Sequence, residues 1–533
     1  MFELRKDIFA DERDDNLKEI GKGTQRQDML GHVTATSTYF NDHKLQGMLH
    51  LKVLRSPHSH ARIRRIDVAE AEKMPGVRRV IRGADVPRNI NTLLSLINFG
   101  IDDEPTLAVD KVRYKGEPLV AVVADSHREA FEALAKIRVD YEPLASVFDV
   151  EEALKPGAPV VNETYPKNSF TFYDKYDHQK LRFGDVARGF AESDHVIEHR
   201  YQMSPIEHAP TETNGSIAAP DTNGRYVVYT STQALFFSLD TCAKILDVPS
   251  NKLHFIGGTV GGGFGGKVDT MTEPLAILGA MLTGRPVRYV FGREEEMQFG
   301  SPRGAERIYV KDGVRRDGRI MARQVRSYFD SGAYTRLSSY AVIKCVAHIP
   351  GPYTIPHVHA DVFCAYTNRT PSTAMRGFGV TALDFALECQ MDKLAHLVGM
   401  DPMEFRILNA YRDGDMKAHR RIAKNTALIE CVQVAAEKAK WKIGEEFKRA
   451  SSLKDGGGER AQITLTPRDA AISFPSRPAA AAQQRTSYDR GTVAPLAPEP
   501  VPPPPPRPQA PAPAPASSSH GATRFSSVFG RRR

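Results

Sequence analysis

The spacing of apolar side chains along the chain predicts a mixture of strands and helices. Residues 47–56, GMLHLKVLRS, alternate apolar and polar positions as a half-buried strand does. Residues 118–125, PLVAVVAD, are continuously apolar and favour a buried strand. Residues 126–137 have helical spacing and 138–144 are extended again. This order of strand, helix and strand predicts one compact unit.

A second region of alternating patterns extends from about residue 167 to 440 and predicts further strands and helices. After Trp441, the only tryptophan, the apolar periodicity fades. The region's expected strands are 225–234, 252–258 and 286–292, and its expected helices are 235–248, 274–284, 382–400 and 401–411.

Two of the expected helices begin with a capping-box pattern, and a third has Asp401 as its cap with Pro402 in its first turn. Ser126 followed by Glu129, and Thr270 followed by Glu273, both match the capping box, in which a hydroxyl and a carboxylate bind opposite main-chain N–H groups. Gly284 is placed to end the second of these helices.

Composition divides the chain unevenly. Its net charge is +8, but residues 451–533 hold eleven basic and five acidic residues and so account for +6. The basic character is therefore a property of the C-terminal segment, which argues against a nucleic-acid-binding protein. That segment, residues 442–533, is rich in proline and alanine and is expected to be a disordered tail. A proline-rich ligand for a partner domain, or a linker, is the alternative.

The cysteines disfavour a metal cluster within this chain, because none of them forms a C-x-x-C pair. Their scattered positions suit a reducing cytoplasm. Residues 1–23 show no apolar signal segment, and no apolar run approaches the roughly 18 residues of a membrane span. We therefore expect a cytoplasmic protein without a membrane span. The cysteines are Cys242, Cys345, Cys364, Cys389 and Cys431.

The sequence GTVGGGFGGKVD, residues 258–269, is the densest glycine cluster and the first candidate site. Gly261, Gly266 and Lys267 match a nucleotide-binding P-loop, but Val268 stands where that loop needs a hydroxyl for Mg²⁺. Residues 261–266 also match the dinucleotide-binding pattern, although no acidic residue follows at the required spacing of about 20. The glycines indicate close approach of a large ligand, with an anion or oxo group held by main-chain N–H donors at a helix N-terminus.

The glycine cluster, read together with YTNRTPSTAMRGFG at 366–379, resembles the molybdenum hydroxylases, that is, the molybdopterin-binding subunits of xanthine dehydrogenases and aldehyde oxidases. Residues 54–77 and 114–144 resemble the N-terminal α/β hammerhead domain of that family, and STQA at 231–234 also follows the family's order. The resemblance covers about residues 24–441.

This resemblance implies an α+β chain with an N-terminal lead-in, two domains and a tail. It also implies a molybdenum–molybdopterin cofactor, in the cytosine dinucleotide form, that hydroxylates an aldehyde or N-heteroaromatic carbon with oxygen from water. Iron–sulfur clusters and FAD are then expected on partner subunits. The expected boundaries are 1–23 for the lead-in, 24–165 for the hammerhead domain, 166–441 for the first molybdopterin-binding lobe and 442–533 for the tail.

Residue roles follow from the same resemblance. Gln233 matches the glutamine that hydrogen-bonds the apical oxo group. Gly262, Gly263, Phe264 and Gly265 match the loop whose main chain approaches the metal centre. Arg376 matches a residue with a main-chain contact to the cofactor, and Phe378 matches an aromatic residue that packs on a planar substrate.

Two further positions bear on the substrate. Val268 stands where purine-oxidising members have a glutamate, and Lys344 stands where they have an arginine. An apolar residue at 268 favours aldehydes and N-heteroaromatic compounds over xanthine.

The chain departs from the family after Trp441. A second lobe with a G-Q-G segment and a late general-base glutamate is not recognisable there, and a general base typically contributes 10²–10⁴-fold to rate. A frame-shifted or prematurely ended gene is the favoured explanation, with a native tail on a split subunit as the alternative. We therefore expect impaired activity. Two other functions stay open: an NAD-dependent dehydrogenase that uses residues 261–266, and a non-catalytic interaction protein that recruits partners through its proline-rich tail.

Overall fold

The computed structural model describes residues 25–91 and 94–453 of the 533-residue chain. The expected lead-in at 1–23 and the proline-rich part of the expected tail lie outside the described residues.

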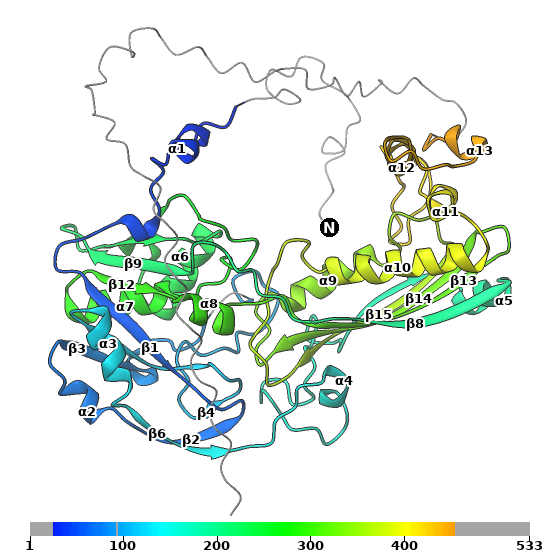
Figure 1. The fold of residues 1–533 in the computed structure, drawn as a ribbon. Coiled ribbons are helices and arrows are strands. Elements are labelled where there is room, and N and C mark those ends of the chain that lie inside the picture. The colour runs from blue at the N-terminus through cyan, green and yellow to red at the C-terminus, as the bar shows by residue number, and fades with distance from the viewer. Residues whose placement is uncertain (1–24, 92–93, 454–533) are drawn as a thin grey trace, which may run out of the picture. The chain divides into compact units, whose positions relative to one another are not determined.

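A seven-stranded sheet joins strands from both expected domains (Figure 1). Strand β1 pairs in parallel with β12 and antiparallel with β5, so it lies between them. Helices α6 (Leu235–Ile245) and α7 (Glu273–Thr283) pack on this sheet, as does α3 (His127–Leu134). The strand order is β11 (Leu253–Gly257), β10 (Tyr226–Thr230), β9 (Gly215–Pro220), β12 (Val287–Val290), β1 (Leu49–Arg55), β5 (Pro118–Ala124) and β3 (Val77–Arg82).

The expected compact strand–helix–strand unit is wrong in its last step. Strand β6 (Arg138–Pro143) does not return to the sheet of β5 but joins a three-stranded sheet with β2 (Ala61–Asp67) and β4 (Lys111–Val112). The burial patterns explain the difference, because β5 is buried almost throughout while β6 alternates between exposed and half-buried positions. A small core between the two sheets includes Val80, Leu119 and Val120 and is flanked by α2 (Ala69–Glu72).

A five-stranded sheet, which the sequence patterns did not single out, carries the largest hydrophobic core. Helices α9 (Ser338–His348) and α10 (Thr381–Leu397) lie along one face of it (Figure 1). Arg323 and Asp312 form an ion pair inside this body, with no exposed side-chain surface on either residue and 2.9 Å between Nε and Oδ1. The strand order is β7 (Gln179–Phe183), β15 (His357–Tyr366), β14 (Ile320–Gly332), β13 (Glu306–Val314) and β8 (His195–Met203).

Three helices follow the five-stranded sheet and extend the packed structure past residue 441. Ile443 is buried in their shared core, and the carbonyl oxygen of Ser452 accepts a 2.8 Å hydrogen bond from the N–H of Asp413. The expected tail boundary at 442 is therefore too early, because residues up to 453 pack against the preceding helices. These helices are α11 (Pro402–Asn409), α12 (Leu428–Lys438) and α13 (Glu445–Lys448).

The remaining short elements connect these bodies. They are the α-helices α1 (Met29–Val33), α4 (Val150–Ala153), α5 (Val186–Ala191) and α8 (Arg293–Phe299), and the 3₁₀ turns Phe40–Asp42, Gly83–Asp85 and Ser250–Lys252.

Ser126 is confirmed as the N-cap of its helix, but its reciprocal main-chain bond is absent because the Glu129 carboxylate accepts from Ser126 Oγ instead, and the capping box at Thr270 is wrong. Ser126 Oγ accepts a 3.2 Å hydrogen bond from the N–H of Glu129 at the start of α3. Helix α7 instead begins at Glu273 itself, and its carboxylate accepts from the N–H groups of Met271 and Thr272. The Glu273 carboxylate thus binds main-chain N–H groups just before its own helix, and the helix has no side-chain N-cap. Gly284 ends α7 in the left-handed conformation, with φ 66°, as expected.

Candidate functional site

The glycine-rich loop leaves β11 at Gly257 and continues for fifteen residues before α7 begins at Glu273. The expectation that its N–H donors sit at a helix N-terminus is therefore wrong. The first turn of α7 is buried, and the Glu273 carboxylate already binds two of the N–H groups there. This separation also disfavours dinucleotide binding, which places the pyrophosphate directly at a helix N-terminus.

Packing and backbone conformation both require glycine in this loop. A Cβ on Gly263 would lie 2.3 Å from Gln233 Oε1, and a Cβ on Gly265 would lie 2.5 Å from the carbonyl oxygen of Ala374. Gly262 and Gly265 have φ of 97° and 107°. Phe264 has φ 53°, an uncommon conformation for a residue with a side chain, and is 47% exposed. The loop thus presents bare main chain and one exposed ring.

Gln233 holds the loop through its side chain and its main chain. Its Oε1 accepts hydrogen bonds from the N–H of Gly265 at 2.9 Å and of Lys267 at 3.3 Å. Its own N–H donates to the carbonyl oxygen of Lys267 at 2.7 Å. The Nε2 amide group has no hydrogen-bond acceptor within residues 25–91 and 94–453, so both of its N–H donors remain available to a ligand.

The arginine–glycine–phenylalanine turn meets the glycine loop directly. The N–H of Arg376 donates a 2.7 Å hydrogen bond to the carbonyl oxygen of Phe264. Arg303 donates through Nη2 to the carbonyl oxygen of Arg376, and Gly377 has φ 76°. The structure therefore brings together the two motifs on which the family resemblance depends.

Several main-chain donors around this junction are unpaired. The N–H groups of Gly262, Gly263 and Phe264, and those of Gly377 and Phe378, have no acceptor in the part of the chain that the structure describes. Because unpaired N–H groups are costly unless water or a ligand accepts from them, such a cluster favours an anionic or oxo ligand.

Lys267 has a structural position rather than a ligand-binding one. Its side chain is 1% exposed, and its Nζ lies 3.0 Å from Glu212 Oε2. Glu212 also accepts from the N–H of Gly261 at 2.7 Å. Burial lowers the pKa of Lys267, and the charge of Glu212 opposes that shift. A P-loop lysine must reach a phosphate, so this geometry excludes that role.

The expected substrate positions are only partly brought together. Lys344 is exposed on α9, and its Nζ lies 5.3 Å from the ring centroid of Tyr340. The Tyr340 and Phe378 rings lie 6.1 Å apart with a tilt of 32°. Tyr340 thus connects Lys344 with Phe378, a role that sequence reasoning missed. Val268 is half-buried in the loop, and its N–H donates to the carbonyl oxygen of Gly265 at 3.2 Å.

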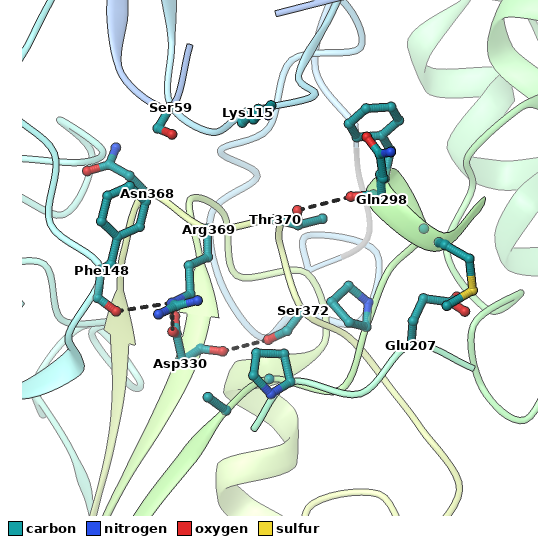
Figure 2. A pocket seen from close by; sticks show the side chains of 17 residues that line it. Ser59, Lys115, Phe148, Glu207, Gln298, Asp330, Asn368, Arg369, Thr370 and Ser372 are labelled. Atoms are coloured by element: carbon teal, nitrogen blue, oxygen red, sulfur yellow. Dashed lines mark hydrogen bonds and ion pairs between the residues drawn. The ribbon is translucent and has the colours of Figure 1, made fainter. Parts of the chain in front are cut away.

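A cavity of about 550 Å³ lies apart from these residues. Figure 2 shows Arg369 in this cavity, between Phe148 and Asp330. Its Nε donates to the carbonyl oxygen of Phe148 at 3.1 Å and lies 3.3 Å from Asp330 Oδ2. None of the sequence-predicted site residues lines it. Its wall includes Glu207, whose neighbour His208 packs behind Gly266.

Within the described residues, no three or more His, Cys, Asp or Glu side chains are grouped so as to hold a metal ion. All five cysteines are free thiols. No helix in residues 25–91 and 94–453 has the length and apolar character that crossing a membrane requires.

Two family models match the chain. Residues 34–145 match the aldehyde oxidase and xanthine dehydrogenase a/b hammerhead domain, and residues 163–410 match the molybdopterin cofactor-binding domain. The expected fold class, a hammerhead domain followed by a molybdopterin-binding lobe, is confirmed.

Individual relatives match over most of the chain. A probable xanthine dehydrogenase subunit of Bacillus subtilis (strain 168) is 35% identical over 73% of this chain and 51% of its own length. The nicotinate dehydrogenase large molybdopterin subunit of Eubacterium barkeri is 34% identical over 81% of this chain and 98% of its own length. The solved aldehyde oxidoreductase of Desulfovibrio gigas superposes with a TM-score of 0.72 and 29% identity, over 79% of this chain and 47% of that structure.

The chain therefore spans about half the length of the first and third of these proteins and nearly all of the second. The matched family models, the relatives and the contact between the glycine loop and the Arg376 turn all indicate the same family. The chain belongs to the molybdenum hydroxylase family, as a molybdopterin-binding large subunit of the xanthine dehydrogenase and aldehyde oxidase type.

Proposed function

We propose that this chain binds molybdenum–molybdopterin at the junction of the glycine loop and the Arg376 turn, and that it serves as the catalytic subunit of a hydroxylase. The substrate is an aldehyde or an N-heteroaromatic compound, and the incorporated oxygen comes from water. The observation that carries the proposal is the set of unpaired N–H donors on both sides of the hydrogen bond between Arg376 and Phe264.

The residues at this junction fit such a cofactor. Glycines at 262, 263 and 265 leave no side chains in the way of a bulky group. The main-chain N–H groups and the free Nε2 of Gln233 are all donors, whereas oxo and phosphate oxygens are acceptors. The nearby carboxylate of Glu212 is mostly buried behind the loop against Lys267, so it does not repel an anion at the front.

Each residue then has a definite task. Gln233 donates through Nε2 to an oxygen of the bound group while its Oε1 fixes Gly265 and Lys267. Arg376 orients the loop by binding Phe264, and Phe378 offers a ring against which a planar substrate packs. When bound, the molybdenum–molybdopterin group supplies the two-electron oxidation chemistry.

Electron transfer is proposed to continue outside this chain, with iron–sulfur clusters and FAD on partner subunits in the cytoplasm. The free and mostly buried cysteines support this division of labour. The cytosine dinucleotide form of the cofactor is part of the same proposal. A relative that this chain covers over 98% of its length bears the name of a large molybdopterin subunit, which supports work within an assembly. The general base would then come from outside residues 24–441.

The test is cofactor retention. The chain, expressed in a host that makes molybdopterin together with the iron–sulfur and FAD subunits of a related hydroxylase, should purify with molybdenum by mass spectrometry and with a fluorescent pterin oxidation product. Gln233→Leu should lower both while circular dichroism stays unchanged. Protein without molybdenum or pterin, from a host in which a known molybdenum hydroxylase is loaded, would refute the proposal.

A further inference from the structure

Strand β8 is the last strand of the five-stranded sheet, and its outer edge is unpaired. Within residues 25–91 and 94–453, its main-chain groups bond to β13 and to no other segment. In an antiparallel sheet every second residue of an edge strand turns its N–H and C=O away from the neighbouring strand, where they can bind another chain. The edge of β8 is therefore open to a further strand.

β8 lacks the features that usually protect such an edge. Sheet edges are commonly kept from pairing by short strands, prolines or bulges. β8 has nine residues, contains neither proline nor glycine, and pairs with β13 without a shift in register. The strand at the opposite edge of this sheet, β7, has five residues. A long and regular edge of this kind is suited to strand pairing between chains.

Charged side chains can also protect an edge, but Glu198 and Arg200 instead favour pairing with a second copy. Both are exposed, they share one face of β8, and neither has an ion-pair partner in the part of the chain that the structure describes. His199 lies between them, at the midpoint of the strand. If two copies of β8 pair antiparallel about an axis at His199, all nine residues find a partner and each Glu198 faces Arg200 of the other copy. An axis at Glu198 or at Arg200 would place like charges opposite each other.

The other face of β8 supplies apolar contacts in the same register. Ile197 and Tyr201 lie on the face that α10 covers (Figure 1), and each would stand opposite the other across the axis. Phe385 of α10 meets the Tyr201 ring edge-on, with 6.3 Å between centroids and 87° between planes, and is itself 47% exposed. A second sheet that continues the first would cover more of this ring, and burial of apolar surface favours association.

We propose that the edge of β8 is a self-association surface, at which two copies of this chain pair antiparallel about a two-fold axis through His199. The two five-stranded sheets then form one continuous sheet. Such an interface is isologous, so every contact in it occurs twice. The inference does not depend on the proposed function, because residues 195–203 belong neither to the glycine loop nor to the Arg376 turn.

Charge reversal tests both the interface and its register. Sedimentation velocity of the full chain across the micromolar range should show a dimer. Glu198→Arg and Arg200→Glu each create two like-charged pairs across the axis, so each should raise the dimer dissociation constant about tenfold or more. The double variant restores opposite charges and should return the constant to within about threefold of the parent. Phe385→Ala should also weaken the dimer, because less apolar surface is buried.

Glu70→Arg is the matched control, because it makes the same charge change at an exposed residue of α2 that has no ion-pair partner among the described residues. It should leave the dissociation constant unchanged. Circular dichroism should be the same for all of these variants. Hydrogen exchange gives an independent readout, since the N–H groups of β8 should become more protected as the concentration of the chain rises, and less so in Glu198→Arg.

Rescue by the double variant is the decisive result, because a purely structural role for Glu198 or Arg200 would not produce it. A chain that stays monomeric throughout the concentration range would overturn the inference. So would a dimer that neither single reversal weakens, or one that both reversals weaken and the double variant does not restore.

Discussion

The N–H of Arg376 binds the carbonyl oxygen of Phe264 at 2.7 Å, and through this bond two distant segments form one surface of unpaired donors. The bond depends on the path of the glycine loop, because Phe264 keeps a positive φ of 53° between Gly263 and Gly265. Changes that move this loop should therefore affect the whole junction.

Gly263→Ala should abolish most cofactor retention while the fold remains. The new Cβ would lie 2.3 Å from Gln233 Oε1, so the glutamine must release Gly265 and Lys267. Molybdenum content by mass spectrometry should fall about tenfold or more, since two hydrogen bonds of about 1 kcal/mol each are lost. Gly258→Ala is the control, because its nearest neighbour would be the carbonyl oxygen of Thr38 at 3.7 Å. Equal molybdenum content in the two variants would contradict the assignment of the loop.

Lys267→Met should destabilise the protein by about 3 kcal/mol in chemical unfolding, because it leaves the largely buried Glu212 carboxylate without its cation. Adding Glu212→Gln should restore part of the loss. Lys155→Met, which breaks an exposed pair with Glu152, should leave stability unchanged. If Lys267→Met alone were neutral, Lys267 would not stabilise the loop.

Stability should decrease as pH rises from about 5 to 8, partly because of Glu306. Burial raises the pKa of Glu306 to about 8, with Arg303 opposing the shift. Between the ordinary value of 4.5 and 8 the folded protein keeps this proton and the unfolded chain releases it, so a higher pH favours unfolding. Glu306→Gln, measured by urea titration across this range, should make the decrease shallower. Burial also raises the pKa of Asp103 and of Glu117 to about 7, so these two groups should still make the unfolding free energy of Glu306→Gln decrease as pH rises.

Ser126→Ala should cost about 1 kcal/mol of unfolding free energy, because the N–H of Glu129 loses its acceptor at the start of α3. Ser126→Asp retains a capping oxygen and should be close to the parent. Molybdenum content should be the same in both, since α3 packs on the sheet away from the junction. A large drop in molybdenum in Ser126→Ala would show that the α3 region is coupled to the site.

The sequence predicted local structure well where burial and periodicity agree, and less well where partners are distant. The continuous apolar run of β5 and the capping residue of α3 are local properties, and both predictions are confirmed. The pairing of β1 with β12 joins Leu49 to Val287, and nothing near either residue specifies the other. The place of β6 in a separate sheet was missed for the same reason.

The candidate site was likewise predicted in its local motifs but not in its long-range contacts. The glycines and Arg376 were recognisable as motifs, and the structure brings them into contact. Lys267 matched a phosphate-binding pattern. Its buried ion pair with Glu212, which only the structure shows, gives it a structural role instead. Tyr340 had no motif of its own, because its relevance depends on α9 placing it four residues before Lys344 and beside Phe378. No helix was expected at 338–348, where the structure has α9, so the spacing of four between Tyr340 and Lys344 was not recognised as one helix face.

The position of β1 between β12 and β5 has a consequence for protein engineering. Residues 34–145 carry their own family signature, yet their first strand is an inner strand of a sheet completed by β9 to β12. A fragment cut after residue 145 would turn an interior strand into a bare edge rich in leucine and valine, which invites pairing between copies. A hammerhead segment from another member of the family is therefore a poor replacement for residues 34–145, unless β12, the strand that pairs with β1 at Leu49, is redesigned with it.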